Sequence, residues 1–340
     1  MNDHDSLSPN AVILVTGATG FVGAYVVRDL ILAGYRVKAI RRKNLLPFFV
    51  DNEILRRAEW IEGDIMDIPA MDEAMQGADA IVHAAAMVSF KPSDTEEMFR
   101  INIEGTANMV NLAIDHGIKK FIHVSSVSAI GREKNDILVN ESGTWSGRFR
   151  QTRYGVSKQR AEMEVWRGIA EGLNAVIINP ATILGYGDWN QSSSAIFKSM
   201  YRGFPWYTTH VNGFVGIEDV SRVIVELLTA DVTAERFIVS AENKTYQSIF
   251  NAISDAFGKK RPWRKATPFL AALAWRLELI RSMIQVSPRM ITRETSTLAL
   301  SDSAYDNKKL LSVLPGFKFS PIEEIITGSC NQYSSKVQRL

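Results

Sequence analysis

A glycine-rich turn near the N-terminus constrains the fold of this chain more than any other feature. The apolar run Val12–Val15 precedes it, and such a run is typical of a strand that is covered on both faces. Gly17, Gly20 and Gly23 follow at G-x-x-G-x-x-G spacing, which suits a tight turn, a close approach of a pyrophosphate and close helix–strand packing. A helix beginning at Phe21 would point its free N–H groups and positive dipole end at such a phosphate. The pattern predicts a dinucleotide-binding βα unit, and the competing interpretation is a tight turn without a ligand.

The end of the next expected strand indicates which dinucleotide would bind. A helix over residues 21–33 leads into a strand at Arg36–Ile40, and Arg41, Arg42 and Lys43 follow that strand. An acidic residue here would accept a hydrogen bond from the ribose of NAD, whereas basic residues would pair with the 2′-phosphate of NADP. The sequence therefore favours NADP(H), with NAD(H) possible, and the alternative is a solvated basic loop.

A short third strand is expected at residues 59–65 and a fourth, buried strand at residues 80–86. In the third strand, Asp64 would contact the edge of the adenine ring or cap the following turn. His83 in the fourth strand and His123 in a later one are interpreted as hydrogen-bonded core residues rather than metal ligands. No second His or Cys stands at metal-ligand spacing, so we expect no metal site.

A serine, a tyrosine and a lysine form the expected catalytic group. A strand at residues 121–126 ends in Ser126, at the carboxyl edge where doubly wound sheets bind ligands. Tyr154 and Lys158 are four residues apart in a helix expected over residues 152–171, so they share one face. The ammonium would favour the phenolate and lower the pKa of the tyrosine towards the working range of a general acid–base. A serine hydroxyl that binds the substrate oxygen and a nicotinamide that carries hydride would complete an oxidoreductase site.

The motifs resemble those of the extended short-chain dehydrogenase/reductase family, whose branch here includes nucleotide-sugar epimerases, dihydroflavonol reductases and 3β-hydroxysteroid dehydrogenases. The resemblance spans most of the chain, in family order. It implies an NAD(P)-dependent oxidoreductase with a doubly wound parallel Rossmann sheet (α/β) and a smaller, interleaved C-terminal substrate lobe. The matching segments are TGATGFVG at 16–23, GDI at 63–65, HAAA at 83–86, NIEGTAN at 102–108, HVSSVSAIG at 123–131, YGVSK at 154–158, INPATILGYGD at 178–188 and FVGIEDVSR at 214–222.

The resemblance also implies roles for single side chains. Tyr154 is the implied acid–base, Ser126 rather than Ser125 is the implied catalytic serine, and Lys158 would also hold the nicotinamide ribose. Asn102 matches a position near the active site, and its alternative role is to cap a helix or brace the backbone. The expected cofactor-binding residues are Gly17, Thr19, Gly20, Phe21, Val22, Arg41, Arg42, Asp64, Ile65, Ala84, Ala85, Tyr154, Lys158, Pro180, Thr182 and Ile183.

Length and composition bound the domain organisation. A chain of 340 residues with 46% hydrophobic content can bury a sizeable core and accommodate a Rossmann domain with a smaller lobe. We expect a disordered tail at residues 1–10, an NADP-binding domain at 11–178 and a mainly substrate-binding lobe at 179–340. Segments around 214–240 are expected to return to the Rossmann core.

Charge and cysteine content bear on partners and compartment. The net charge is +2 with lysines and arginines spread along the chain, so no nucleic-acid partner is indicated. The single cysteine, Cys330, cannot form an internal disulfide, which suits a reducing compartment. The polar start does not resemble a signal peptide, and no apolar run is long enough to span a membrane. We therefore expect a cytoplasmic enzyme that acts on a small molecule, and the resemblance adds a possible homodimer.

The second half carries a different pattern. It predicts a substrate loop at Gly185–Tyr207, a helix at Gly216–Thr229, a strand at Arg236–Ser240 and a helix at Tyr246–Phe257. The segment Pro268–Val286 has a strongly amphipathic helical pattern. It is interpreted as a hydrophobic lid, a membrane-surface contact or a helix packed into the substrate lobe.

Apolar and aromatic side chains crowd the expected rim of the site and favour a hydrophobic pocket. Val127 and Ser128 stand where sugar dehydratases carry an Asp-Glu pair, and Val211–Gly213 lacks the Arg-Asp that often precedes this strand in nucleotide-sugar enzymes. Both observations favour NADPH-linked reduction, or the reverse oxidation, of a carbonyl or alcohol on a small hydrophobic substrate. The substrate-pocket candidates are Met87, Phe90, Ser128, Trp145, Asn179 and Trp189, and Phe149 is a further aromatic of the rim.

Two other functions stay open. Asn179 before Pro180 occurs in some sugar epimerases at a position that can face a diphosphate, which favours a nucleotide-sugar epimerase or reductase with retained NAD(H). The third hypothesis is a catalytically silent NADP-binding regulatory protein. Such proteins usually lose the tyrosine or the lysine, and here Ser126, Tyr154 and Lys158 are all present.

Overall fold

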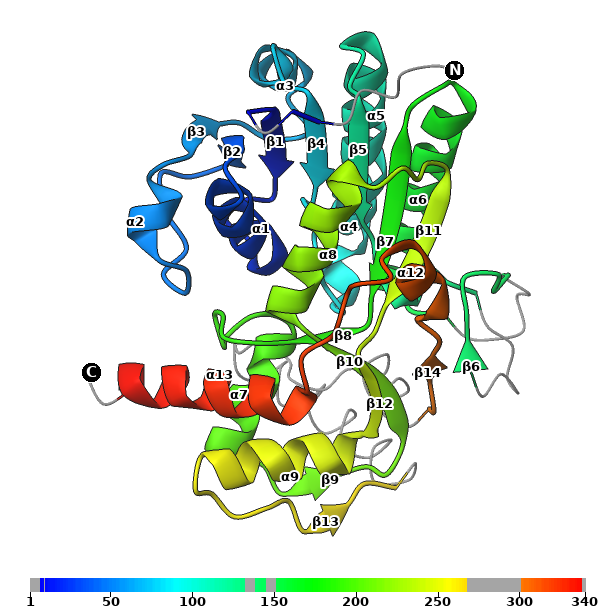
Figure 1. The fold of residues 1–340 in the computed structure, drawn as a ribbon. Coiled ribbons are helices and arrows are strands. Elements are labelled where there is room, and N and C mark those ends of the chain that lie inside the picture. Colours follow the sequence, from blue (N-terminus) through cyan, green and yellow to red (C-terminus); the bar gives the residue numbers. More distant parts are fainter. Residues whose placement is uncertain (1–6, 9, 132–137, 145–150, 268–300, 338–340) are drawn as a thin grey trace.

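The computed structural model describes residues 7–8, 10–131, 138–144, 151–267 and 301–337 (Figure 1). The amphipathic segment expected at residues 268–286 lies outside the described residues, and so do two aromatic residues expected at the substrate rim, Trp145 and Phe149.

A seven-stranded sheet with the order β11-β7-β5-β4-β1-β2-β3 forms the centre of the molecule. Every neighbouring pair of strands in it is parallel. The strand order reverses between β1 and β4, and doubly wound sheets bind ligands beyond the carboxyl ends of such a pair. The prediction of a doubly wound parallel Rossmann sheet is confirmed. The strands are β1 (Val12–Thr16), β2 (Arg36–Arg41), β3 (Glu59–Glu62), β4 (Ala80–His83), β5 (Lys120–Val124), β7 (Ala175–Pro180) and β11 (Glu235–Val239).

Helices cover both faces of this sheet, because alternate side chains of each strand point to opposite faces (Figure 1). Ile13 and Val15 of β1 belong to one core cluster, whereas Leu14 between them belongs to another. The first cluster includes side chains of α1 (Phe21–Leu32), α2 (Asn52–Leu55), α8 (Ile217–Thr229) and α12 (Lys308–Val313). The second includes side chains of α3 (Ile68–Met75), α5 (Gly105–Asp115) and α6 (Arg153–Ala170). A short segment, η1 (Pro92–Asp94), α4 (Thr95–Phe99) and the π-helical η2 (Arg100–Glu104), leads into α5.

A smaller part of the molecule lies beyond the carboxyl edge of the central sheet (Figure 1). Its three-stranded sheet has the order β12-β10-β8, and its core gathers Phe197, Ile249 and Ile326 from three helices. The strands are β8 (Thr182–Leu184), β10 (Val211–Gly216) and β12 (Glu242–Thr245), and the helices are α7 (Ala195–Tyr201), α9 (Tyr246–Ala256) and α13 (Ile322–Val337). Two short pairs, β9 (Trp206–Tyr207) with β13 (Arg264–Lys265) and β6 (Leu138–Val139) with β14 (Ala304–Tyr305), complete the described strands.

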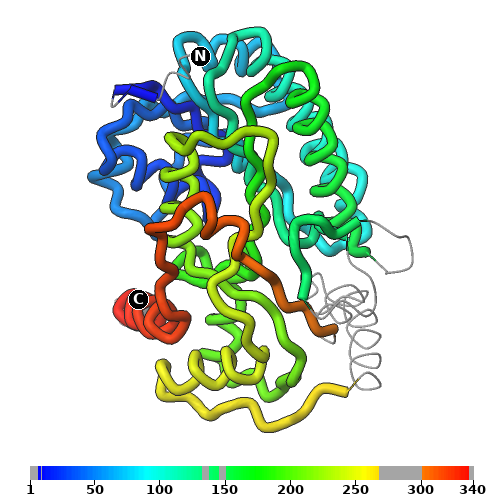
Figure 2. The backbone as a smooth tube through the Cα atoms, turned by 45° about the vertical axis from the view of Figure 1, so that its right-hand side comes forward, coloured from blue at the N-terminus to red at the C-terminus, as the bar shows by residue number. Residues whose placement is uncertain are grey.

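The chain passes back and forth between the two parts. After β10 it returns to the central sheet through α8 and β11 and then leaves it again at β12. The segment from residue 301 onward runs along both parts before it ends in α13 (orange to red in Figure 2). The predicted domain boundary between residues 178 and 179 stays a prediction. In the structure this position lies within β7, which pairs with β11 in the central sheet.

Several predicted elements have different ends in the structure. The strands expected at 59–65, 80–86 and 121–126 end at Glu62, His83 and Val124. Each stops early because the chain leaves the sheet at its carboxyl edge to form a loop or turn. The segment expected as one loop at 185–207 contains a 3₁₀ turn, η4 (Ser192–Ser194), as well as α7 and β9.

The expected loose tail does not include residue 7. Leu7 is only 8% exposed and belongs to the core cluster of α1 and α8. Burial of this apolar side chain stabilises the fold. The polar residues around Leu7 in the sequence gave no indication of that burial. No helix in the described ranges is both long and apolar enough to cross a membrane.

Candidate active site

The glycine turn after β1 forms a narrow backbone cradle. Gly17 has a φ of +65°, and a Cβ on it would lie 2.6 Å from the backbone nitrogen of Ala85 and 2.7 Å from the carbonyl oxygen of Ala84. A Cβ on Gly23 would lie 2.2 Å from the carbonyl oxygen of Gly17. Only glycine fits these two positions without a shift of the backbone. The turn therefore brings the start of α1 and the loop after β4 as close together as backbone atoms allow.

The N-terminus of α1 is open to a ligand. Its N-cap is Gly20, and no side chain caps the helix, so the first N–H groups and the positive end of the dipole can face an anion. Thr19 and Gly20 are exposed, while Phe21, Val22 and the two alanines of the β4 loop, Ala84 and Ala85, are half-buried.

Arg41 lies at the carboxyl end of β2 with its guanidinium 5.7 Å from the ring centre of Trp60. Its Nε is buried and has no hydrogen-bond partner among the described residues. Arg42 is exposed. A buried donor without a partner is uncommon, and a phosphate oxygen would satisfy it. The glycine cradle fits the pyrophosphate of a nicotinamide dinucleotide.

Asp64 and Ile65 follow β3. One carboxylate oxygen of Asp64 accepts a hydrogen bond from Met66 N at 3.0 Å, which matches the turn-capping alternative; a contact with adenine stays a prediction. Ile65 is buried, and its carbonyl oxygen accepts from Asn108 Nδ2 at 3.1 Å. A Cβ on Gly105 would lie 2.5 Å from Ile65 Cδ1, so α5 packs closely against this turn.

The three predicted catalytic residues come together beyond β5. Ser126 caps a short 3₁₀ turn, η3 (Val127–Ala129), and its Oγ accepts from Ser128 N at 3.1 Å. Tyr154 lies in the first turn of α6, whose N-cap Thr152 accepts a hydrogen bond from Gly155 N at 2.9 Å. Lys158 is 2% exposed and donates from Nζ to the carbonyl oxygen of Val124 at 2.8 Å.

The pKa shift of the tyrosine runs against the prediction. Tyr154 is partly exposed as a residue, but its hydroxyl lies deep among protein atoms, and burial raises its pKa to about 12; hydrogen bonding to Ser126 opposes this rise. Burial lowers the pKa of Lys158 to about 8, and the charge of Glu162 opposes that fall. The expected lowering of the tyrosine pKa by Lys158 is wrong for this geometry, because burial penalises the phenolate more and Lys158 Nζ is bound to Val124.

Asn102 is a brace of the site. It lies in the π-helical turn η2, is 1% exposed, and its amide exchanges two hydrogen bonds with the backbone of Met87, at 2.7 and 3.0 Å. The same Nδ2 donates to Ser157 Oγ at 2.9 Å, and Ser157 Oγ donates to the carbonyl oxygen of Tyr154 at 2.8 Å. Asn102 thus ties the loop after β4 to the first turn of α6.

The substrate-pocket candidates fall into two groups. Phe90 packs edge-on against Tyr154 with ring centres 6.0 Å apart. Met87, in the loop after β4, and Ser128, in η3, are half-buried. Trp189 instead stacks on Tyr333 of α13, with ring centres 5.2 Å apart, and belongs to the core of the smaller part of the molecule. Part of its large apolar surface is thus buried by this packing, and a contact of Trp189 with substrate stays a prediction.

Asn179 is fully buried in β7, so the expectation that it faces a substrate diphosphate is wrong. Its Nδ2 donates to Ser126 O at 2.9 Å and to Glu162 Oε1 at 2.5 Å. These two bonds satisfy the donor side of the amide, whereas its buried Oδ1 has no hydrogen-bond partner among the described residues.

The segment after β7 runs through the other predicted cofactor contacts. Pro180 is buried at the end of β7, while Thr182 and Ile183 are half-buried in β8. Thr182 Oγ1 accepts from Asn212 Nδ2 at 2.7 Å, and the carbonyl oxygen of Ile183 accepts from Ser193 Oγ at 2.5 Å. Whether these residues contact a cofactor stays a prediction.

His83 is hydrogen-bonded as predicted, but His123 is not. His83 Nδ1 lies 2.7 Å from Thr16 Oγ1, and its Nε2 lies 3.1 Å from Thr106 Oγ1. The ring of His123 stacks 5.4 Å from that of His83, and neither of its nitrogens has a partner in the described part of the chain. Both rings are completely buried, and desolvation holds both pKa values far below the usual range, that of His83 at about 3. Within the described ranges no group of His, Cys, Asp and Glu side chains is arranged to hold a metal ion.

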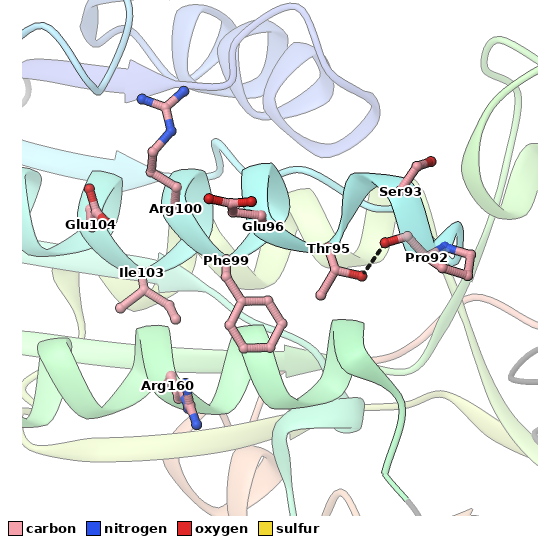
Figure 3. A pocket seen from close by; sticks show the side chains of 9 residues that line it. All are labelled: Pro92, Ser93, Thr95, Glu96, Phe99, Arg100, Ile103, Glu104 and Arg160. Atoms are coloured by element: carbon pink, nitrogen blue, oxygen red, sulfur yellow. Dashed lines mark hydrogen bonds between the residues drawn. The ribbon is translucent and has the colours of Figure 1, made fainter.

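A cavity of about 630 Å³ lies on a different side of α6. Figure 3 shows it between the η1–α4–η2 segment and Arg160. Arg160 follows Lys158 by two residues, so it points to nearly the opposite side of the helix. The cavity is separate from the predicted catalytic group. Its lining residues are Pro92, Ser93, Thr95, Glu96, Phe99, Arg100, Ile103, Glu104 and Arg160.

Sequence reasoning missed two features of the site. The first is Gly155, where a Cβ would lie 2.6 Å from the carbonyl oxygen of Ser128, so this glycine lets α6 approach the Ser126 turn. The second is Glu162, a carboxylate that is 2% exposed, one helical turn after Lys158. The spacing from Lys158 was a possible signal for Glu162, but its burial could not be read from the sequence.

Known proteins share this arrangement of chain and fold. The sequence pattern of the NAD dependent epimerase/dehydratase family matches residues 13–239. The chain belongs to this family. It is an NAD(P)-dependent oxidoreductase of the extended short-chain dehydrogenase/reductase type, as the sequence motifs predicted.

Individual relatives align with most of this chain. It is 32% identical over 259 residues to sterol demethylase protein B of Methylococcus capsulatus, which covers 75% of this chain and 77% of that protein. A putative dihydroflavonol 4-reductase of Synechocystis sp. is 29% identical over 331 residues, 94% of each chain. Among solved structures, that of gox2253 superimposes with a TM-score of 0.77 at 28% identity, over 95% of this chain and 99% of the other.

Proposed function

We propose that this family member is an NADPH-linked reductase of a carbonyl on a small hydrophobic substrate, able also to catalyse the reverse oxidation. The observation that carries the proposal is the placement of Tyr154, whose hydroxyl interacts with Ser126 and whose ring contacts Phe90. Lys158 lies one helical turn further on the same face of α6. Ser126, Tyr154 and Lys158 are the proposed catalytic residues.

The protonation states of these residues favour reduction. With a pKa of about 12, Tyr154 is a neutral phenol at physiological pH, which is the state that donates a proton. A nicotinamide dinucleotide whose pyrophosphate is held at the glycine cradle would supply hydride for the carbonyl carbon. Tyr154 gives its proton to the carbonyl oxygen, Ser126 donates a hydrogen bond to the same oxygen, and the charge of Lys158 stabilises the phenolate that remains. The product is an alcohol, and Tyr154 regains its proton from solvent.

The preference for NADP rests on Arg41 and Arg42. The unpartnered Nε of Arg41 lies at the end of β2, where doubly wound folds distinguish the two dinucleotides. Arg41 and the exposed Arg42 would pair with a 2′-phosphate. The other proposed cofactor-binding residues near the cradle are those predicted from the sequence, namely Gly17, Thr19, Gly20, Phe21, Val22, Asp64, Ile65, Ala84 and Ala85.

The hydrophobic substrate class rests on two observations. Phe90 presents an aromatic ring directly beside Tyr154. Two relatives are named for a sterol and for a dihydroflavonol, both of which are polycyclic. A polycyclic or aromatic ketone is therefore the proposed substrate class. The nucleotide-sugar alternative loses the residue that favoured it, because Asn179 is buried and bound to Glu162.

A homodimer is the proposed assembly. By family resemblance, the helices after β4 and β5 pair subunits, and the outer surface of these helices carries the half-buried apolar side chains of Phe99 and Ile103. Light scattering of the wild-type protein and of a Phe99→Glu variant tests this. A dimeric mass that the variant halves is expected, and a monomeric wild-type mass contradicts the assembly.

The catalytic proposal is tested by following NADPH consumption with a panel of aromatic and alicyclic ketones. Tyr154→Phe keeps the ring against Phe90 but removes the proton donor, so turnover is expected to fall at least about 100-fold while NADPH binding persists. If the variant turns over any accepted ketone at the wild-type rate, Tyr154 is not the acid. If no ketone is reduced but a sugar nucleotide is interconverted, the proposed reaction is wrong.

A further inference from the structure

Glu162 is a buried carboxylate that the mechanism above leaves without a role. It lies four residues after Lys158, on the same face of α6, and is 2% exposed. Taking an isolated carboxylate out of water is costly unless other groups compensate its charge and hydrogen bonds. The partners of Glu162 therefore indicate what holds it in the interior.

One carboxylate oxygen of Glu162 is joined to the serine turn. Oε1 accepts from Asn179 Nδ2 at 2.5 Å, and the same Nδ2 donates to the carbonyl oxygen of Ser126 at 2.9 Å. Burial raises the pKa of Glu162, and the nearby Ser125 hydroxyl opposes this rise, although its oxygen has no hydrogen bond of normal geometry among the described residues. A single amide thus connects the carboxylate of α6 to the backbone of Ser126.

The other oxygen faces a fixed arginine. Arg236 Nη1 lies 3.4 Å from Glu162 Oε2, and the rest of its guanidinium donates to the carbonyl oxygens of Glu141 and Gly143. Lys158 and Arg236 thus place two cations around one buried anion. Lys158 has little contact with water, so loss of the Glu162 charge would remove the anion that favours the charged form of its buried ammonium.

We propose that Glu162 is a positioning residue of the active site. Its carboxylate keeps Lys158 charged and, through Asn179, holds the backbone that carries the Ser126 hydroxyl. This inference rests on the proposed function, since it assigns Lys158 and Ser126 the roles given there. In agreement with the contacts, the charge of Glu162 raises the pKa of Lys158 against the larger effect of burial, which leaves it at about 8.

The test is the pH dependence of nucleotide binding in Glu162→Gln. NADPH is titrated into the full-length protein between pH ~6 and ~10, with NADH in parallel, and affinity is expected to fall as Lys158 loses its proton. Removing the adjacent opposite charge is expected to move the midpoint of that fall down by about 1 pH unit. Glu164→Gln is the matched control, because Glu164 is on the same helix, 30% exposed and paired with Arg167; its midpoint is expected to match the wild type.

A second background separates charge from packing. In Lys158→Met the titrating group is gone. Adding Glu162→Gln to this variant should therefore leave the pH dependence of NADPH affinity unchanged. A folded Glu162→Gln protein with the wild-type midpoint overturns the proposal, and so does an equal shift in the Lys158→Met background. If Glu162→Gln does not fold, Glu162→Asp takes its place. A shift of about half a unit with a several-fold lower kcat is then expected, and wild-type values for both overturn the proposal.

The serine connection has its own test. Asn179→Ala keeps the Glu162 charge but removes the amide that reaches Ser126 O. It should lower kcat for an accepted ketone about tenfold, with KM and the binding midpoint little changed; an unchanged kcat removes Asn179 from the proposal. The nucleotide titrations of Glu162→Gln need no ketone substrate. A shifted binding midpoint in that variant, together with no ketone turnover by the wild type, therefore refutes only the proposed function. A wild-type protein that binds neither nucleotide refutes the proposed function and, with it, this inference.

Discussion

Gly155 of α6 lies against the carbonyl oxygen of Ser128 so closely that a Cβ on residue 155 would stand 2.6 Å from that oxygen. Tyr154 precedes this glycine, and Ser126 caps the turn that contains Ser128. The absence of one side chain therefore sets how near the tyrosine comes to the serine.

Gly155→Ala should separate the two proposed catalytic groups. The new methyl group must push α6 away from the turn, at a cost of about 1–3 kcal/mol in stability and about tenfold or more in kcat. Gly328→Ala in α13 is the control, because a Cβ there meets no heavy atom within 4 Å. Thermal unfolding and ketone reduction are measured for both. Wild-type kcat in Gly155→Ala would show that this contact does not position Tyr154.

Gly17→Ala should abolish dinucleotide binding. Gly17 and Gly77 both have positive φ, +65° and +71°, so alanine is strained at either position by about 1–2 kcal/mol. Only at Gly17 would the Cβ also collide with backbone, at Ala84 and Ala85. Calorimetric titration with NADPH is expected to show no binding to Gly17→Ala and wild-type affinity for Gly77→Ala. Equal behaviour of the two variants contradicts the cradle.

Arg41→Asp with Arg42→Ala should reverse the nucleotide preference. Each charged hydrogen bond to a phosphate is worth about 1.5–3 kcal/mol, so NADPH affinity should fall about 100-fold while NADH affinity changes less than about threefold. Arg36→Ala, an exposed arginine at the other end of β2, is the control and should change neither. Equal losses for both nucleotides would mean that the arginines do not bind the 2′-phosphate.

His123 should make the protein sensitive to acid. Its folded-state pKa lies well below the ordinary value, so the unfolded chain takes up a proton first as the pH falls. Stability is complete above about pH 6.5 and falls below it by about 1.4 kcal/mol per pH unit for each buried neutral histidine.

His123→Leu is expected to remove about half of this dependence, since His83 retains its own contribution. His116→Asn is the control, because His116 is partly exposed and bound to Asp72. Urea unfolding at several pH values between ~5 and ~7.5 measures the slopes. The same slope in His123→Leu and the wild type would contradict a neutral buried His123.

The local signals in the sequence were sufficient for the fold. The glycine turn, the apolar strands and the Tyr-x-x-x-Lys spacing are each contained in a few consecutive residues, so they indicate the βα unit and the shared face of Tyr154 and Lys158 without knowledge of the tertiary structure. Strand ends were less predictable, because Ala84–Ala86 and Ser125–Ser126 are as compatible with a strand as the residues before them.

Features that depend on distant residues could not be predicted. Asn179 is buried in contact with Glu162 and Ser126, and Trp189 is partly buried by stacking on Tyr333, 144 positions later in the sequence. The pKa of Tyr154 was predicted from the charge of Lys158 alone, but desolvation by the surrounding protein has the larger effect. Each error came from a contact or a degree of burial that only the folded chain defines.

The most direct test of the proposed reductase is the state of its nucleotide. The protein is purified without added cofactor and denatured, and any released nicotinamide nucleotide is identified by chromatography and absorbance; a native sample is then titrated with NADPH and NADH. The account predicts an empty or readily emptied protein that binds NADPH in preference to NADH, because a reductase exchanges its nucleotide in every cycle. Stoichiometric NAD⁺ that resists dialysis would contradict it and indicate an enzyme that regenerates a retained cofactor.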